Sequence, residues 1–426
     1  MYKFIHLADC HLGAQKYPEL KELEIEAFKE CLDIAMEKDV DFIILSGDLF
    51  HSNIPDMGIV KEAVGKLKEI KEDGIPVYVT YGSHDFSPNE TSIIDVITES
   101  GLLKKLFNAN VVENDAGKEW LILKFTIDEK TNARITGISG RKTGIEEEYF
   151  KILDRKILED EKGFKIFVFH TSIKELIPDF LSKMDGINLN NFPKGFDYYA
   201  GGHIHKRIVG NDFEGYGPII YPGPLFAGYP RDMEMSAKGE KRGFYIVEFD
   251  EKIHNIDFCE LNLAEYQLLA YDANHKTSNQ LSEEIIAEIE NKGAKGKIEG
   301  RIVILKVKGE LSGGKTSEIN FQDIRRLLKS NGAIHVSINH HGLISKEFSE
   351  IRVKGETTDE IEENLLLENI NNIEVGTKEL KDRNGANLAV RLMKTIRQSP
   401  KPNEKKGDYN NRILKDSLRI LEVEES

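Results

Sequence analysis

Cysteine is scarce in this sequence, with only Cys10, Cys31 and Cys259 among 426 residues. Three cysteines cannot form a disulfide framework and their spacing fits no zinc site, so we expect each to be a small buried hydrophobic residue. Long apolar runs are also missing: the longest have the length of strands, and none can span a bilayer. The first residues enter a strand pattern at once, which leaves no room for a signal peptide. These features predict a cytoplasmic protein without a membrane segment.

Basic residues are outnumbered by acidic ones. The chain has 58 lysines and arginines against 73 aspartates and glutamates, a net charge of −15. A protein that wraps nucleic acid by charge alone is normally basic, so the composition argues against that class. Part of the acidity belongs to candidate metal ligands, whose charge bound cations would neutralise. Any contact with nucleic acid must therefore be local, assisted by metal, or shared with a partner.

What the sequence does contain is a series of short buried strands that end in polar residues. Residues 42–45 form an apolar run, and Ser46, Gly47 and Asp48 follow it. An acidic residue at the carboxyl end of a buried parallel strand lies where open α/β sheets bind their ligands. Taken alone, Asp48 is better explained as a residue that caps the next turn. Four other segments with the same arrangement favour a ligand.

Strands and helices alternate along the first part of the chain, the order typical of a parallel α/β sheet. We expect strands at residues 3–8, 41–46, 76–81, 165–169, 219–221, 243–249 and 253–259, with another from residue 198. We expect helices at residues 19–38, 57–72, 92–99 and 146–159.

Polar side chains with metal-ligand chemistry collect at these strand ends. They are Asp9, His11, Asp48, Ser83, His84, His170, His203 and His205. Counting His51, half of the twelve histidines occupy such positions. Mixed carboxylate and imidazole ligands suit Mn²⁺, Fe²⁺ or Zn²⁺ better than Ca²⁺ or Mg²⁺. The set is large enough for two ions roughly 3.5–4 Å apart that share one carboxylate, an arrangement that activates water against a phosphoester. The sequence therefore predicts phosphoester hydrolysis without a covalent nucleophile.

The pattern changes near residue 261, where we place the end of a first domain at 1–260. Residues 261–355 predict a small α+β domain, whose last strand we expect at 334–338. His340 and His341 follow that strand without a carboxylate motif, and we interpret them as a solvated strand end.

Residues 356–426 predict a polar linker and a helical hairpin. The helices are expected at 386–397 and 412–423, each with one apolar face. Such a hairpin either packs on its own protein or docks on another chain.

At the strand ends the sequence resembles the calcineurin-like metallophosphoesterase superfamily. Five segments stand in the order typical of that family: Asp9-x-His11, Gly47-Asp48, Gly82-x-His84-Asp85, His170 and Gly202-His203-x-His205. Residues 6–13, 47–51, 202–206, 221–224 and 243–248 narrow the match to the archaeal SbcD-like double-strand-break repair nucleases. These are the catalytic partners of an SMC-like coiled-coil ABC ATPase. The resemblance is close over about the first 260 residues, and the later parts fit the family's DNA-capping domain and ATPase-docking helices by order and size only.

The resemblance implies a fold and a reaction. It implies a β-sandwich flanked by helices, a small α+β capping domain and a C-terminal helical hairpin. It implies a Mn²⁺-dependent exonuclease and endonuclease that hydrolyses phosphodiester bonds at DNA ends. The protein would work as a homodimer and in complex with the ATPase.

The resemblance also implies a role for each matching residue. Asp9, His11 and His205 would hold one of two Mn²⁺ ions per chain, His170 and His203 the other, and Asp48 would bridge them. His84 would contact the scissile phosphate and protonate the leaving oxygen, and Asp85 would orient its ring. His51 matches the family's second histidine on the phosphate side. Lys206 and Arg207 follow the ligands and either contact backbone phosphates or are simply solvated.

The sequence departs from the family at two positions. The family usually has asparagine where this chain has Ser83, and that asparagine ligates the second metal. A hydroxyl group is shorter, so we expect weaker occupancy of the second site. Pro224 replaces a serine beside the substrate. Two alternatives to the nuclease remain open: a generic phosphatase or phosphodiesterase of the same superfamily, and a non-catalytic structural subunit.

Overall fold

The computed structural model describes residues 1–86, 91–113, 117, 119–141, 146–345, 362, 366–367, 380, 382–401 and 404–421. It divides into two compact units. The first contains Met1–Ala273, Asn279–Lys308 and Ile319–Gly342, and the second contains Asn274–Ser278, Gly309–Glu318 and Leu343–Ser426. The domain boundaries near residues 260 and 355 stay a prediction.

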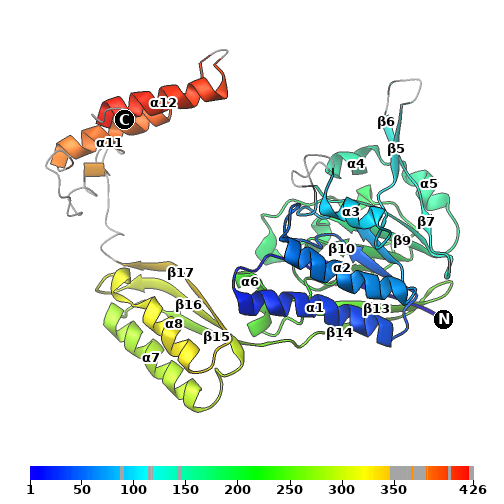
Figure 1. The fold of residues 1–426 in the computed structure, drawn as a ribbon, viewed down its shortest axis with the longest axis horizontal. Helices are drawn as coiled ribbons and strands as arrows, with labels where there is room; N and C mark the ends of the chain where they lie inside the picture. Colours follow the sequence, from blue (N-terminus) through cyan, green and yellow to red (C-terminus); the bar gives the residue numbers. More distant parts are fainter. Residues whose placement is uncertain are drawn as a thin grey trace. The chain divides into compact units, whose positions relative to one another are not determined.

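Two six-stranded sheets form the centre of the first unit (Figure 1). Across the first sheet the strands are β14 (Ile253–Glu260), β13 (Gly243–Phe249), β1 (Tyr2–Leu7), β2 (Phe42–Ser46), β3 (Val77–Thr80) and β4 (Lys104–Lys105). Across the second they are β11 (Ile208–Gly210), β12 (Ile219–Tyr221), β10 (Tyr198–Gly202), β9 (Lys165–His170), β8 (Arg134–Ile138) and β7 (Thr126–Ile127). Strands β1 to β4 run parallel, as do β8, β9, β10 and β12. Each sheet therefore has a parallel centre; antiparallel pairing completes one edge of the first sheet and both edges of the second.

The two sheets pack face to face around a shared apolar core. Phe4, Phe42 and Tyr78 of the first sheet belong to one buried cluster with Val168 and Tyr198 of the second. Phe4 and Phe42 stack with ring centroids 5.0 Å apart. Burial of each such side chain stabilises the fold by about 1.5–3 kcal/mol, so this layer holds the sheets together.

Helices cover the outer faces of the sandwich. Helices α1 (Pro18–Glu37) and α2 (Met57–Glu72) belong to the buried cluster of the first sheet, and α4 (Glu146–Ile152) and α5 (Arg155–Asp160) to that of the second. Helix α2 begins where Asp56 accepts hydrogen bonds from the Gly58 and Ile59 amides, the usual way to satisfy the first free N–H groups. The predicted fold class, a β-sandwich flanked by helices, is confirmed.

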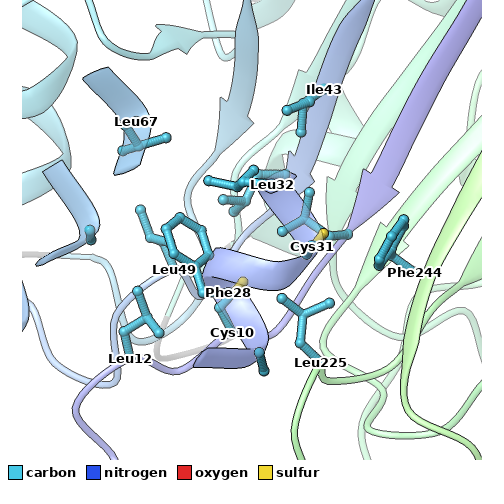
Figure 2. Close-up of a cluster of buried hydrophobic side chains, with 14 of the residues drawn as sticks. Cys10, Leu12, Phe28, Cys31, Leu32, Ile43, Leu49, Leu67, Leu225 and Phe244 are labelled. Atoms are coloured by element: carbon cyan, nitrogen blue, oxygen red, sulfur yellow. The ribbon is translucent and has the colours of Figure 1, made fainter. Parts of the chain in front are cut away.

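The core beneath α1 also anchors the first polar motif. Figure 2 shows Cys10, Phe28 and Cys31 among the buried side chains of this cluster. Cys10 is 7% exposed although its neighbours Asp9 and His11 are polar. Its side chain packs in the core, so it fixes the backbone between the two candidate ligands. Cys10 and Cys31 are buried and free as predicted, and Cys259 is half-buried against the same cluster.

The helix predicted at residues 146–159 is wrong in one respect, because the structure divides it. Helix α4 ends at Ile152, and Leu153 forms a β-bridge with Leu121. Asp154 then caps α5 by accepting a hydrogen bond from the Ile157 amide. A tertiary contact with another strand outweighs the local helical pattern.

The α+β part contains a three-stranded sheet and two helices (Figure 1). The elements are β15 (Glu265–Asp272), α7 (Ser278–Ala294), β16 (Arg301–Leu311), α8 (Phe321–Ser330) and β17 (His335–Ser345). Strand β17 continues seven residues past the predicted end at residue 338. His340 and His341 are exposed, as expected, but they lie within the strand.

The remaining α-helices and strands of the described residues are α3 (Ile93–Glu99), the hairpin of β5 (Ala109–Glu113) and β6 (Glu119–Leu123), α6 (Pro230–Ala237), α11 (Asp382–Ile396) and α12 (Lys406–Leu421). Helices α11 and α12 contact each other and form the predicted hairpin. Ile396 and Leu414 on these helices are 54% and 57% exposed. Most of the predicted linker before α11 lies outside the described residues.

Candidate metal centre

The candidate ligands meet at one edge of the sandwich because the parallel strands end there. Asp9 and Asp48 follow β1 and β2, while His170 ends β9 and His203 follows β10. The Asp9 amide donates to the Gly47 carbonyl, and the His203 amide donates to both carboxylate oxygens of Asp9 at 3.0 and 3.2 Å. The second sheet is thus tied to the first at the ligands themselves.

The backbone at four of these positions is strained. Asp9, His11, Asp48 and His203 have φ angles of 52°, 47°, 53° and 92°. Side chains other than glycine rarely adopt this left-handed region, and each such residue costs on the order of 1–3 kcal/mol. The surrounding sheet edges impose a conformation that the free chain would avoid.

Two motif glycines are required by close packing. A Cβ atom on Gly202 would lie 2.0 Å from the Ser46 carbonyl oxygen, and one on Gly82 would lie 2.1 Å from Asp48 Oδ1. Only a residue without a side chain lets these loops approach so closely. Gly202 therefore lets the second sheet approach the first, and Gly82 lets the loop after β3 approach the loop after β2.

The candidate ligands form three groups, and inside each group the ligand atoms lie within 4.8 Å of one another. The groups are Asp9, His11 and His205; Asp9, Asp48 and His170; and His11, His51 and His84. Asp9 belongs to two of the groups, and Asp48 Oδ2 lies 3.6 Å from His11 Nε2 and 3.1 Å from His170 Nε2.

Two expected ligands lie outside these groups. The ring of His203 is centred 5.3 Å from that of His170. Ser83 Oγ lies 3.5 Å from Asp48 Oδ2. Both residues are therefore neighbours of the cluster, and their roles as ligands stay a prediction.

Three histidines direct ring nitrogens into the cluster. His170 Nδ1 donates to the Ser46 carbonyl oxygen at 2.7 Å, which leaves Nε2 to face the two aspartates. That Nε2 atom is fully buried and lies 3.1 Å from Asp48 Oδ2. His11 Nε2 and His205 Nε2 face each other at 2.9 Å. Converging ring nitrogens of this kind fit a bound cation, which would take up their lone pairs and release the protons that they share with Asp48 and with each other.

The electrostatics of the cluster also favour a cation. Burial works to lower the pKa of His170, but the charges of Asp48 and Asp9 raise it to about 10. Burial works to raise the pKa of Asp48, but His170 and His11 hold it below its usual range. The buried carboxylates thus draw positive charge to the place where the histidine nitrogens converge, and the residues fit a metal centre.

His84 is held by His51 rather than by Asp85. His84 Nδ1 lies 2.7 Å from the His51 carbonyl oxygen, to which it donates. The Asp85 carboxylate instead accepts from the amides of Leu49, Phe50 and Gly82 at 3.0–3.3 Å. The role expected for Asp85, orientation of the His84 ring, therefore falls to the backbone of His51. Asp85 stabilises the loop that follows Asp48.

Three supporting residues escaped the sequence reasoning. Tyr229 Oη lies 2.8 Å from His51 Nδ1, and Asp232 Oδ2 lies 2.9 Å from His205 Nδ1. Glu24 on α1 accepts the Gly13 amide at 2.6 Å, just after the first motif. None belongs to a motif: Tyr229 and Asp232 come from a segment far along the chain, and Glu24 comes from the helix that follows the first motif. In the sequence, each is only an acidic residue on a predicted or short helix or an aromatic residue just before one, and nothing in that pattern indicates a contact with the site.

Glu24 gives the fold a pH dependence that can be measured. Burial raises its pKa to about 7 from an ordinary 4.5. The folded state therefore holds the proton more tightly, and stability falls as pH rises from about 4.5 to 7. The loss amounts to about 3 kcal/mol at 1.36 kcal/mol per pKa unit. The measurement is urea unfolding in the presence of a chelator at several pH values. The free energy of unfolding of Glu24→Gln should lack this fall.

Glu26→Gln is the matched control, because Glu26 is exposed on the same helix. It should follow the wild-type pH profile. Equal profiles for Glu24→Gln and the wild type would show that Glu24 is ionised normally.

Two cavities meet at the cluster. One of about 740 Å³ is lined by polar residues that include Arg141, Glu146 and Lys174. The other, of about 390 Å³, has apolar walls that include Phe180 and Tyr229. Both are lined by Ser83, His84, Met184 and His203. A substrate at these residues thus meets a polar space on one side and an apolar space on the other.

In the part of the chain that the structure describes, no helix is long and apolar enough to cross a membrane.

Comparison with known proteins gives one consistent relationship. Residues 2–207 match the calcineurin-like phosphoesterase family. A protein of Methanococcus maripaludis named DNA double-strand break repair protein Mre11 is 31% identical over 60% of this chain and 66% of its own length. Proteins of the same name are similar in Archaeoglobus fulgidus, at 29% over 58% of this chain and 57% of the relative, and in Methanocaldococcus jannaschii, at 30% over 62% and 68%.

The chain spans less than two thirds of the length of the first two relatives. The matched region contains all of the ligand-type residues described above. The chain belongs to the calcineurin-like phosphoesterase family, in the branch that contains the archaeal Mre11 proteins.

Proposed function

We propose that this protein is a Mn²⁺-dependent DNA nuclease that acts at DNA ends in double-strand-break repair. The observation that carries the proposal is the convergence of Asp9, His11, Asp48, His170 and His205 beside His84. The family implies a dinuclear metal centre, and the donor set fits it. The name of the relatives motivates DNA as the substrate.

The residues would divide the work as follows. Asp9, His11 and His205 would hold one Mn²⁺, with His170 and His203 at the other. Asp48 would bridge, since its carboxylate faces both His11 and His170. When bound, two such ions supply a polarised water and neutralise charge on the phosphate oxygens.

His84 is suited to protonate the leaving oxygen. Its Nδ1–H donates a hydrogen bond to the His51 carbonyl oxygen, and a carbonyl oxygen cannot donate one in return. The other nitrogen, Nε2, is therefore the one that exchanges a proton with the substrate. His51 is half-buried beside it, with ring centroids 4.8 Å apart, and the Tyr229 hydroxyl holds its Nδ1. Both histidines can thus contact one phosphate in a fixed orientation.

Contact with DNA is expected to be local. The chain has a net charge of −15. Lys206 Nζ lies 5.4 Å from the Phe180 ring centroid, and the Arg207 guanidinium lies 4.6 Å from that of Phe258. Phe180 lines the apolar cavity at the site, so Lys206 is the better candidate for a phosphate contact. We propose that a coiled-coil ABC ATPase supplies most of the remaining affinity, with the α11–α12 hairpin as its docking element.

Homodimerisation is part of the proposal. Ile54 and Met57, just before and at the start of α2, are 82% and 69% exposed. A single exposed apolar side chain is normal on a protein surface, so it is the closeness of these two in the sequence that favours a contact surface here. They give the dimer a candidate location in the first domain.

Ser83→Asn is expected to strengthen the second metal site. Ser83 lies near Asp48, but its hydroxyl is too short to replace an amide oxygen. Restoring asparagine should tighten the weaker of two Mn²⁺ binding steps by about tenfold. Loss of one supporting contact typically lowers the affinity of a metal site by about 10–100-fold, and we expect a gain at the low end of that range. Isothermal titration with Mn²⁺ measures this directly. An unchanged second step would show that Ser83 already ligates fully or that position 83 has no part in the site.

The test of the function is digestion of linear double-stranded DNA with Mn²⁺, beside a small chromogenic phosphodiester. Degradation of DNA, abolished by chelator, supports the nuclease. Fast hydrolysis of the small ester with intact DNA would move the protein to the generic phosphodiesterases. Binding of a single Mn²⁺ with no hydrolysis of either would support a non-catalytic subunit.

A further inference from the structure

Helix α6 lies against the site although it carries none of the expected ligands. Tyr229, the residue before it, hydrogen-bonds His51, and Asp232 within it hydrogen-bonds His205. One short segment therefore contacts two histidines with different expected tasks. His205 belongs to the ligand cluster with Asp9, while His51 groups with His84.

Asp232 is buried more deeply than a carboxylate normally is. It is 1% exposed, and its Oδ2 faces His205 Nδ1 at 2.9 Å. A buried carboxylate is costly unless hydrogen bonds compensate it, so this contact is specific rather than incidental. A carboxylate accepts only, so it holds the proton of His205 on Nδ1. The Nε2 lone pair then faces His11 Nε2 and the cluster.

Arg242 holds this pair in place. It donates from Nη2 to the Asp232 carbonyl and from Nη1 to the His205 carbonyl, both at 3.1 Å. Its Nε donates to Ser236 Oγ at 2.9 Å, so the guanidinium also fixes the last turn of α6. Arg242 is 5% exposed. A planar guanidinium that spans both backbones restricts the relative motion of Asp232 and His205.

We propose that Asp232 is a positioning residue for the metal centre, which fixes the tautomer and ring orientation of His205, and that Arg242 clamps the two residues together. The proposal rests on the metal centre of the proposed function. Buried carboxylates that orient a ligating histidine raise its basicity as well, and their loss typically weakens metal affinity by about 10–100-fold.

The geometry separates this role from that of Tyr229. Tyr229 reaches His51 and not His205 through its hydroxyl group. Removing that hydroxyl should disturb His51 without weakening metal binding. Tyr229→Phe is therefore a matched control on the same segment.

The test is isothermal titration of metal-free protein with Mn²⁺. Asp232→Asn keeps the shape of the side chain and leaves the backbone carbonyl that Arg242 contacts. We expect one of two binding steps to weaken by about 10–100-fold. The other step, and thermal unfolding in chelator, should stay within experimental error of the wild type. Tyr229→Phe should leave both binding steps unchanged.

The outcomes distinguish this inference from the proposed function. Two Mn²⁺ steps in the wild type and unchanged steps in Asp232→Asn would overturn the positioning role alone. No Mn²⁺ binding by the wild type would overturn the metal centre itself. Equal weakening of both steps with a lower unfolding temperature in chelator would make Asp232 a structural residue.

Discussion

Replacing His84 by alanine is expected to reduce the cleavage of linear DNA by about 10²–10⁴-fold, the usual contribution of a general acid. The ring is fixed by the His51 carbonyl, so its free nitrogen is oriented before substrate binds. Metal binding should persist, because Asp9, Asp48, His170 and His205 remain. The measurement is the initial rate of Mn²⁺-dependent digestion, with Mn²⁺ binding followed by titration of the same preparations.

His254→Ala provides the comparison for His84→Ala. His254 lies on the edge strand β14 and forms an ion pair with Asp250, which precedes that strand. Within the described residues it has no contact with the cluster. It should cleave DNA at the wild-type rate. Full activity in His84→Ala would refute the general-acid role. Loss of activity together with loss of Mn²⁺ would make His84 a ligand instead.

Gly202→Ala is expected to lower the free energy of unfolding and to impair metal binding at the same time. The new Cβ would meet the Ser46 carbonyl oxygen at 2.0 Å and His170 Nδ1 at 2.7 Å. Neither neighbour can move freely, because one is strand backbone and the other is hydrogen-bonded to it. Overpacking of this kind costs about 1–3 kcal/mol or more. Chemical denaturation and Mn²⁺ titration measure the two effects.

Gly65→Ala is the matched control. Gly65 is exposed on α2, and a Cβ there would meet nothing within 4 Å. The change should stabilise the protein by about 0.5–1 kcal/mol, as alanine favours a helix over glycine. An unfolding midpoint of Gly202→Ala at or above that of the wild type would show that the two sheets can separate at the site without cost.

The positions of the strand-end residues could be predicted from the sequence because the signal is local. A buried strand such as β2 is an apolar run, and Asp48 follows it within two residues. Parallel neighbours then bring His170 and His203 to the same edge, although they are far away in the chain. The pattern predicts the residues that gather there, but not the distances between their atoms.

The supporting contacts could not be predicted because they are not local. Glu24, Tyr229 and Asp232 carry no motif, and each acts through a partner that tertiary packing supplies. The family resemblance implies that Asp85 orients the His84 ring, whereas its carboxylate accepts hydrogen bonds from three backbone amides. The break at Leu153 likewise follows from pairing with Leu121, which lies 32 residues earlier. The sequence pattern does not predict contacts between side chains that only the tertiary fold brings together.

The left-handed backbone at Asp9, His11, Asp48 and His203 has a consequence for efforts to make this protein more heat-resistant. Glycine adopts that region without strain, so replacement of one of these residues relaxes the local backbone, but it also removes the contacts of the side chain. At Asp9 those contacts are the hydrogen bonds from the His203 amide that join the two sheets. Where relaxation of the backbone is the larger effect, a library screened only by unfolding temperature should accumulate inactive variants that have lost a ligand. Screening in the presence of metal has the opposite effect. An ion that binds only the folded chain raises the unfolding temperature of variants that keep its ligands.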